Sequence, residues 1–118
     1  MEIGNIKFKV KKTLDGKWIK GDLVHHKDSD NVWITDYENQ LTSPVDPSTV
    51  CMFTGLKDKN GTPIYEGDVI LYKDNISEIR GEICWNNHIS FFTFGCGLLC
   101  YYPTNCMVVI GNKFDKKK

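Results

Sequence analysis

The chain has 118 residues, of which 41% are hydrophobic and 25% are charged. These proportions are typical of a soluble globular protein and exclude the collagen-like, disordered and membrane classes. Fifteen Lys and Arg residues balance fifteen Asp and Glu residues, so the chain lacks the excess of positive charge that drives binding to nucleic-acid phosphates. A chain of this length can bury a core without a disulfide framework or a metal.

The chain contains no apolar run of the roughly 18 residues that a membrane span needs, and its start lacks the apolar centre of a signal peptide. We therefore expect a cytoplasmic protein with no membrane partner. An odd number of cysteines, five, also argues against a secreted disulfide scaffold. The alternative role for the cysteines is a zinc site, whose ligands would be Cys84, Cys96, Cys100 and Cys106. Their spacing includes no Cys-x-x-Cys pair, which argues against zinc. We therefore expect neither a metal nor a cofactor.

The first third of the chain predicts three antiparallel strands. Residues Ile6–Lys11 alternate apolar and basic side chains, which is the pattern of a half-buried strand. The Asp15-Gly16 pair favours a hairpin turn, and Trp18–Val24 is expected to be the returning strand. A third strand is expected at Val32–Thr35, because it is rich in β-branched and aromatic residues.

The middle of the chain predicts loops with one short helical turn. Asp46 precedes Pro47, which is the arrangement of a capping residue followed by proline at the first helical position. The segment is too short for a full helix. We expect at most one or two such turns in the whole chain.

The second half predicts further short strands with turn residues between them, which is typical of an all-β sandwich or barrel. The expected strands are Ile64–Tyr72, Ile79–Trp85, His88–Phe94, Leu98–Tyr102 and Cys106–Ile110. The sequence therefore predicts a mainly β fold, with an N-terminal β-meander and loop-rich linker in residues 1–60 and a small barrel-like, SH3-like half in residues 61–118. The sequence leaves open whether the two halves have separate hydrophobic cores or share a single core. A Gly-Asp step occurs in each half, at Gly21-Asp22 and at Gly67-Asp68. The sequence leaves open whether the two segments are a true repeat.

Two sets of side chains are candidates for a weak binding surface. Lysines at alternate positions of the first strand would lie on one face, and aromatic residues of the second half could contact or stack on a partner. The first set is Lys7, Lys9 and Lys11, and the second is Trp85, Phe91, Phe92 and Tyr101. A second basic segment is formed by Lys113 with Lys116–Lys118. Nucleic-acid binding is possible through these residues but disfavoured, because the net charge is zero and Arg80 is the only arginine.

The sequence contains no recognisable catalytic arrangement. No Ser, Cys or Asp stands in triad order with a histidine, and Gly95-Cys96-Gly97 lacks the helix that a dinucleotide-binding loop needs. Cys84 and His88 could meet across a turn, but such a pair is disfavoured. We expect that the protein is not an enzyme and has no catalytic residues.

The segment from Phe53 to Gly61, followed by Ile64–Val69, closely resembles the central motif of the YopX family of bacteriophage and prophage proteins. The flanking segments Ile6–Lys9, Lys17–Leu23 and Val109–Asn112 are similar to other parts of that family. The resemblance covers nearly the whole chain. It implies a phage or prophage origin and a bacterial host cytoplasm, and it brings no catalytic residues with it.

These observations together predict a noncatalytic accessory protein that binds a host or phage protein, or a second copy of itself, through a β surface. The alternative is a weak nucleic-acid-binding β module. Self-association is expected because several short aromatic strands in a small chain leave apolar edges or faces uncovered.

Overall fold

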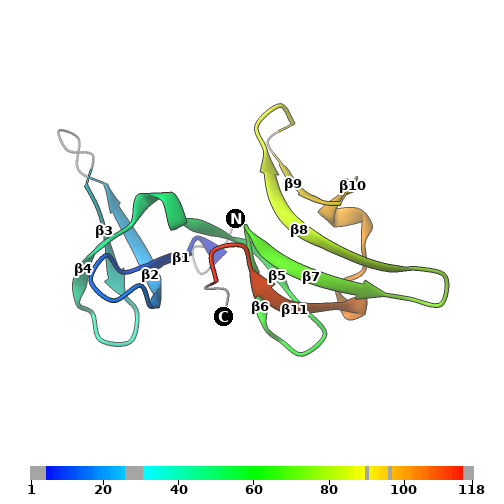
Figure 1. Ribbon diagram of the computed structural model, residues 1–118, viewed down its shortest axis with the longest axis horizontal. Coiled ribbons are helices and arrows are strands. Elements are labelled where there is room, and N and C mark those ends of the chain that lie inside the picture. The colour runs from blue at the N-terminus through cyan, green and yellow to red at the C-terminus, as the bar shows by residue number, and fades with distance from the viewer. Residues whose placement is uncertain (1–4, 26–30, 90, 96, 116–118) are drawn as a thin grey trace. The chain divides into compact units, whose positions relative to one another are not determined.

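The computed structural model describes residues 5–25, 31–89, 91–95 and 97–115, and it is mainly β, as the sequence predicts (Figure 1). The chain forms two compact units, Met1–Phe53 and Thr54–Lys118. Cys96 and Lys116–Lys118, which entered the sequence-based hypotheses, lie outside the described residues. The division into modules at residues 1–60 and 61–118 stays a prediction.

The first unit contains the expected meander. Strands β1 (Phe8–Lys11), β2 (Trp18–His25), β3 (Val32–Asp36) and β4 (Thr42–Val45) pair antiparallel in chain order. Strand β5 (Cys51–Lys57) begins in this unit and pairs with the other side of β1. The apolar side chains that alternate along the first strands form a buried core, made of Val10, Ile19, Ile34 and Val45.

The end of β4 returns to the end of β1. Lys12 forms an isolated bridge with Val45, and the Thr13 N–H donates to the Pro44 carbonyl at 3.3 Å. The chain then enters the 3-10 turn η2 (Pro47–Thr49), where the Asp46 carboxylate accepts from the Ser48 N–H at 3.0 Å. The helical turn predicted after Asp46 is therefore confirmed.

The second unit is built on a five-stranded antiparallel sheet in the order β10-β9-β8-β7-β11. Its strands are β7 (Asp68–Lys73), β8 (Glu78–Asn86), β9 (Phe91–Phe94), β10 (Gly97–Leu98) and β11 (Met107–Asn112), and β6 (Pro63–Tyr65) lies next to β5. The core contains Ile64, Ile70, Tyr72, Ile83, Phe94, Leu99 and Met107. In the described part of the chain this sheet ends at β10 and β11, so the barrel-like half is an open sheet there.

The sequence misplaced several elements. The strand expected at Leu98–Tyr102 is wrong, because the chain leaves β10 at Leu98 and forms the 3-10 turn η3 (Leu99–Tyr101). A further 3-10 turn, η4 (Thr104–Cys106), follows Pro103. The described residues thus contain three such turns, whereas the sequence predicted at most two. Pro103 has no N–H for a strand ladder, which explains why strand-forming residues on both sides of it turn instead. Strands β4 and β5 were not expected.

The two Gly-Asp steps have different structures. Gly21 lies inside β2, where an added Cβ would collide with the carbonyl of Thr35 on β3. Gly67 instead has a φ of 85° and forms the turn between β6 and β7. Glycine is needed at the first position for close strand approach and at the second for a left-handed backbone. The similarity of the two segments thus does not extend to their conformation.

No helix among the described residues is long and apolar enough to cross a membrane.

Candidate functional site

The lysines of β1 lie over aromatic rings of the first unit. The register places Lys9 opposite Lys20 and Lys11 opposite Trp18, so these side chains share one face of the sheet. The Nζ atoms of Lys9 and Lys11 lie 4.9 and 5.3 Å from the centroid of the Trp18 ring. Such cation–π contacts hold ammonium groups in place while leaving their charge intact.

Lys7 lies directly before β1. Its Nζ lies 4.3 Å from the centroid of the Phe53 ring. Lys7, Lys9 and Lys11 are all half-buried, as expected where aliphatic stems cover apolar surface. Each of the three ammonium groups is held by an aromatic ring, and their role as a binding surface stays a prediction.

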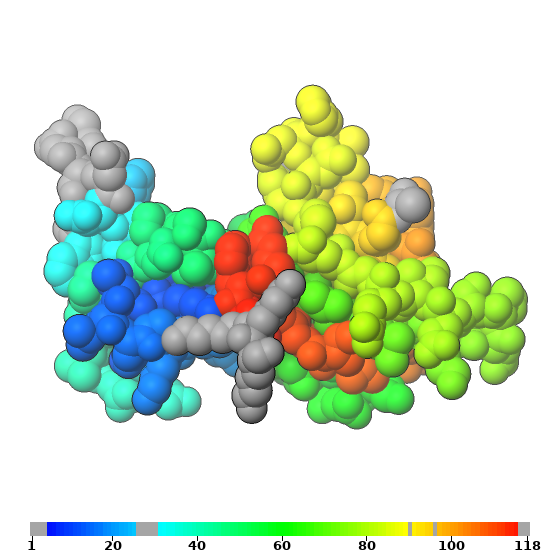
Figure 2. Space-filling view, in the orientation of Figure 1, coloured from blue at the N-terminus to red at the C-terminus, as the bar shows by residue number. Residues whose placement is uncertain are grey.

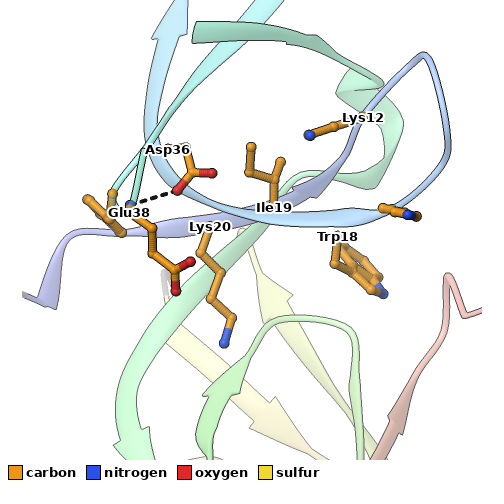
Figure 3. Close-up of a pocket in the computed structure, with 8 residues that line it drawn as sticks. Lys12, Trp18, Ile19, Lys20, Asp36 and Glu38 are labelled. Carbon is orange, nitrogen blue, oxygen red and sulfur yellow. Dashed lines mark hydrogen bonds between the residues drawn. The ribbon is translucent and has the colours of Figure 1, made fainter. Parts of the chain in front are cut away.

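An open pocket of about 390 Å³ borders this face. It is lined by Lys12, Lys17, Trp18, Ile19, Lys20, Asp36, Tyr37 and Glu38. Figure 3 shows the side chains of Trp18, Lys20 and Glu38 extending to the same side of β2. The Asp36 carboxylate is occupied by local bonds, since it accepts from the Glu38 N–H at 2.7 Å. The pocket is lined by both basic and acidic side chains, so its charge selects neither anionic nor cationic ligands.

The aromatic candidates of the second unit centre on the β8–β9 hairpin. Trp85 is directly opposite Phe92, and their rings meet edge to face with centroids 5.0 Å apart. Phe92 also packs against the core, whereas 37% of Trp85 is exposed. This pair extends the apolar face of the hairpin beyond the buried residues.

The other two aromatic candidates lie elsewhere. Phe91 is opposite Asn86 and therefore on the reverse face of the hairpin from Trp85. Tyr101 belongs to η3 and is 75% exposed. The candidate aromatic residues thus form one pair and two separate exposed side chains. Sequence reasoning missed Ile89, which lies in the hairpin turn and is 52% exposed.

The hairpin belongs to a long segment without formal charge. No Asp, Glu, Lys or Arg occurs from Ile83 to Asn112. The segment therefore offers no groups that could neutralise phosphates, and its exposed side chains can contribute mainly apolar contacts and neutral hydrogen bonds. This signal was present in the sequence and identifies the region better than the individual aromatic residues do.

The central motif acts as scaffold around Asp58. Its Oδ1 accepts from the N–H groups of Asn60 and Thr62, both at 2.9 Å. Its Oδ2 accepts from the N–H of Val109 in β11, also at 2.9 Å. Burial acts to raise the pKa of Asp58, but these three donors outweigh it and hold the pKa below the ordinary carboxyl value. The residue therefore stays ionised and joins the motif to β11.

A second buried carboxylate organises the end of the motif. Asp68 is fully buried, and its Oδ2 accepts from the Tyr65 N–H at 2.8 Å. Its Oδ1 accepts from the side-chain amide of Asn112 at 2.9 Å. The bond from Asn112 joins β7 to β11 across 44 residues of sequence, and the bond from Tyr65 joins β7 to the end of β6. Both carboxylate oxygens of Asp68 thus accept hydrogen bonds within the fold.

Among the described residues, no three His, Cys, Asp or Glu side chains gather as metal ligands. Burial and the neighbouring Glu82 carboxylate raise the pKa of the exposed Cys84 thiol, which favours the unreactive protonated form. Cys51 is buried and donates its thiol to the Thr49 carbonyl at 3.4 Å.

Comparison with known families gives one relevant result. A family model described as YopX protein matches residues 7–117, which is nearly the whole chain. The comparison with curated proteins gives no match.

Proposed function

The chain belongs to the YopX family, and on that basis we propose that it is a noncatalytic accessory protein of a phage or prophage, acting in the bacterial cytoplasm as a protein-binding or self-assembling β module. The observation that carries this proposal is the hairpin formed by Ile83–Asn86 of β8 and by β9, which contains no charged residue. Trp85, Ile89 and Phe91 are 37%, 52% and 42% exposed there. Exposed large apolar side chains on one hairpin, with Trp85 on one face and Phe91 on the other, mark a candidate protein interaction site.

The chemistry of the hairpin favours a protein over a nucleic acid. Aromatic residues are enriched at the centres of protein interfaces, and charged residues are depleted there. The hairpin has this composition, because its nearest charged residue in sequence is Glu82. The buried hydrogen bonds of Asp58 and Asp68 support the same proposal, since they assign the carboxylates of the central motif to the scaffold.

Weak nucleic-acid binding is the second candidate, and the lysine face of the first unit favours it. Lys9 and Lys11 lie over Trp18, and an aromatic ring among lysines is a usual arrangement for contacting bases and phosphates. The half-buried position of these lysines and the nearby carboxylates Asp36 and Glu38 reduce the expected affinity.

A pull-down from bacterial host lysate, with and without nuclease, separates the two candidates. The tagged chain and a Trp85→Lys variant are compared. The proposal predicts that captured proteins survive nuclease treatment and are lost with the variant. Capture that disappears with nuclease, and is lost when Lys9 and Lys11 become glutamine, supports the nucleic-acid candidate and contradicts the first.

A further inference from the structure

Strand β8 changes its partner halfway along its length. Its first half, Glu78–Glu82, pairs with β7, and its second half, Ile83–Asn86, pairs with β9. Among the described residues, no strand lies beside Ile83–Asn86 on the side where β7 has ended. Figure 1 shows β8 and β9 continuing past β7, and Figure 2 shows this hairpin, in yellow, projecting from the second unit. The second half of β8 is therefore the edge of a two-stranded ribbon.

The backbone of this edge is oriented for pairing. The Ile83 carbonyl accepts a hydrogen bond of 2.7 Å from the Gly67 N–H, which lies outside the hairpin. In an antiparallel pair, backbone groups that face one side recur at every second residue. The N–H and C=O of Trp85 therefore face the same outer side, beyond the end of β7.

Two other strand edges among the described residues, those of β11 and β4, are covered. At β11, the Lys59 N–H donates to the Met107 carbonyl at 3.1 Å and Asp58 accepts from Val109. At β4, the Pro44 carbonyl accepts from Thr13, and proline itself obstructs strand addition. Proteins normally protect edges with charges, prolines or covering loops. The segment Ile83–Asn86 carries no charge and no proline.

We propose that the outer edge of β8 around Trp85, in the segment Ile83–Asn86 and beyond the Gly67–Ile83 hydrogen bond, pairs antiparallel with the same edge of a second copy of this chain. The inference rests on the proposed function, since it names the partner of the same hairpin. A two-fold interface places a surface against its own copy, so a charged edge would meet like charges. No charged residue occurs from Ile83 to Asn112, so this repulsion is absent. In the dimer, the Trp85 side chain of each copy would pack against the Trp85 side chain of the other copy.

The expected dimer is weak. Four residues extend over about 13 Å of strand, and an aromatic side chain buries about 150–250 Å². Because Trp85 is only 37% exposed, it can bury only part of such an area on pairing, and the interface falls below the roughly 1,200 Å² of stable complexes. We expect a monomer–dimer equilibrium with a dissociation constant in the micromolar range or weaker.

Sedimentation velocity over a concentration series tests the proposal with three charge variants. Trp85→Lys and Trp85→Glu each place like charges across the two-fold axis. Ile76→Lys is the matched control, because Ile76 is 94% exposed in the β7–β8 turn and away from the edge. Circular dichroism verifies that each variant keeps its β fold.

The wild-type chain and Ile76→Lys are expected to dimerise alike, and each Trp85 variant is expected to dimerise at least about tenfold more weakly. An equal mixture of the Lys and Glu variants is expected to recover the dimer, because opposite charges then meet. A wild-type monomer at every concentration, or Trp85 variants that dimerise like the control, overturns the proposal. If the wild type is monomeric but the pull-down still captures a protein through Trp85, the self-pairing proposal fails and the proposed function stands. If the wild type is monomeric and the pull-down captures no protein through Trp85, both the self-pairing proposal and the proposed function fail.

Discussion

The carboxylate of Asp58 accepts a hydrogen bond of 2.9 Å from the backbone N–H of Val109, which lies 51 residues later in the chain. Lys59 adds a second bond to the same strand, from its N–H to the Met107 carbonyl. The turn of the central motif therefore covers the edge of β11. This arrangement explains why a motif dense in turn residues carries a buried, ionised aspartate.

Replacing Asp58 by alanine is expected to destabilise the fold by about 2–3 kcal/mol, because three N–H groups lose their acceptor and all three hydrogen bonds are partly buried. Urea unfolding at neutral pH measures the change. Asp22→Ala is the matched control, since this exposed aspartate bonds only one described side chain, Tyr37; it is expected to cost less than about 1 kcal/mol. Equal losses in both variants would contradict the scaffold role of Asp58.

Acid is expected to destabilise the protein through its hydrogen-bonded aspartates. Hydrogen bonds from Ser48 lower the pKa of Asp46, and the Tyr72 hydroxyl lowers the pKa of Asp74. The pKa of Asp58 is also lowered. A depressed folded-state pKa contributes stability above the unfolded value of about 4, and that stability is lost as the pH falls through the folded value. Urea unfolding between pH 7 and pH 2 should show this loss, with a smaller pH dependence in Asp58→Asn; an unchanged pH dependence in that variant would argue against the assignment.

Gly21→Ala is expected to disrupt the first unit. The added Cβ would overlap the Thr35 carbonyl, so β2 and β3 must separate, at a cost of about 2 kcal/mol or more. Gly111→Ala is the control, because its Cβ would meet only the Asp115 carboxylate at an ordinary 3.4 Å. Thermal unfolding of both variants measures the difference. A Gly21→Ala protein as stable as the control would show that the strands do not approach so closely.

Nucleic acid is expected to bind weakly at most. Three or four lysine–phosphate contacts give a salt slope of about 2 to 4, so little binding survives at physiological salt. Fluorescence anisotropy with single- and double-stranded oligonucleotides should therefore show no tight complex at about 0.15 M salt. A submicromolar, salt-resistant complex would reverse the ranking of the two candidate functions.

Local sequence patterns predicted much of the first unit. Alternation in Ile6–Lys11 predicts β1, which the structure begins two residues later at Phe8, and the Asp15-Gly16 turn leads into β2 as predicted. Capping chemistry places η2 after Asp46. Strand β4 was missed because Pro44 argues against a strand, although an edge position tolerates it. Whether such a segment forms a strand depends on its tertiary contacts, and the local sequence pattern does not specify those contacts.

The candidate site was predicted only in part. Trp85 and Phe92 meet as cross-strand partners, which their positions on either side of the Asn86–Ile89 turn imply. The uncovered edge of β8 could not be predicted, because it depends on where β7 ends and on Gly67 bonding to Ile83. The role of Trp18 beneath Lys9 and Lys11 likewise depends on the strand register.

Hydrogen–deuterium exchange at low and high protein concentration tests most directly whether the β8 edge is the interaction site. The account predicts that the amide of Trp85 exchanges more slowly as the concentration rises, while the amide of Val109, already bonded to Asp58, is protected equally throughout. Exchange at Trp85 that is independent of concentration, or concentration-dependent protection confined to other strands, would contradict it.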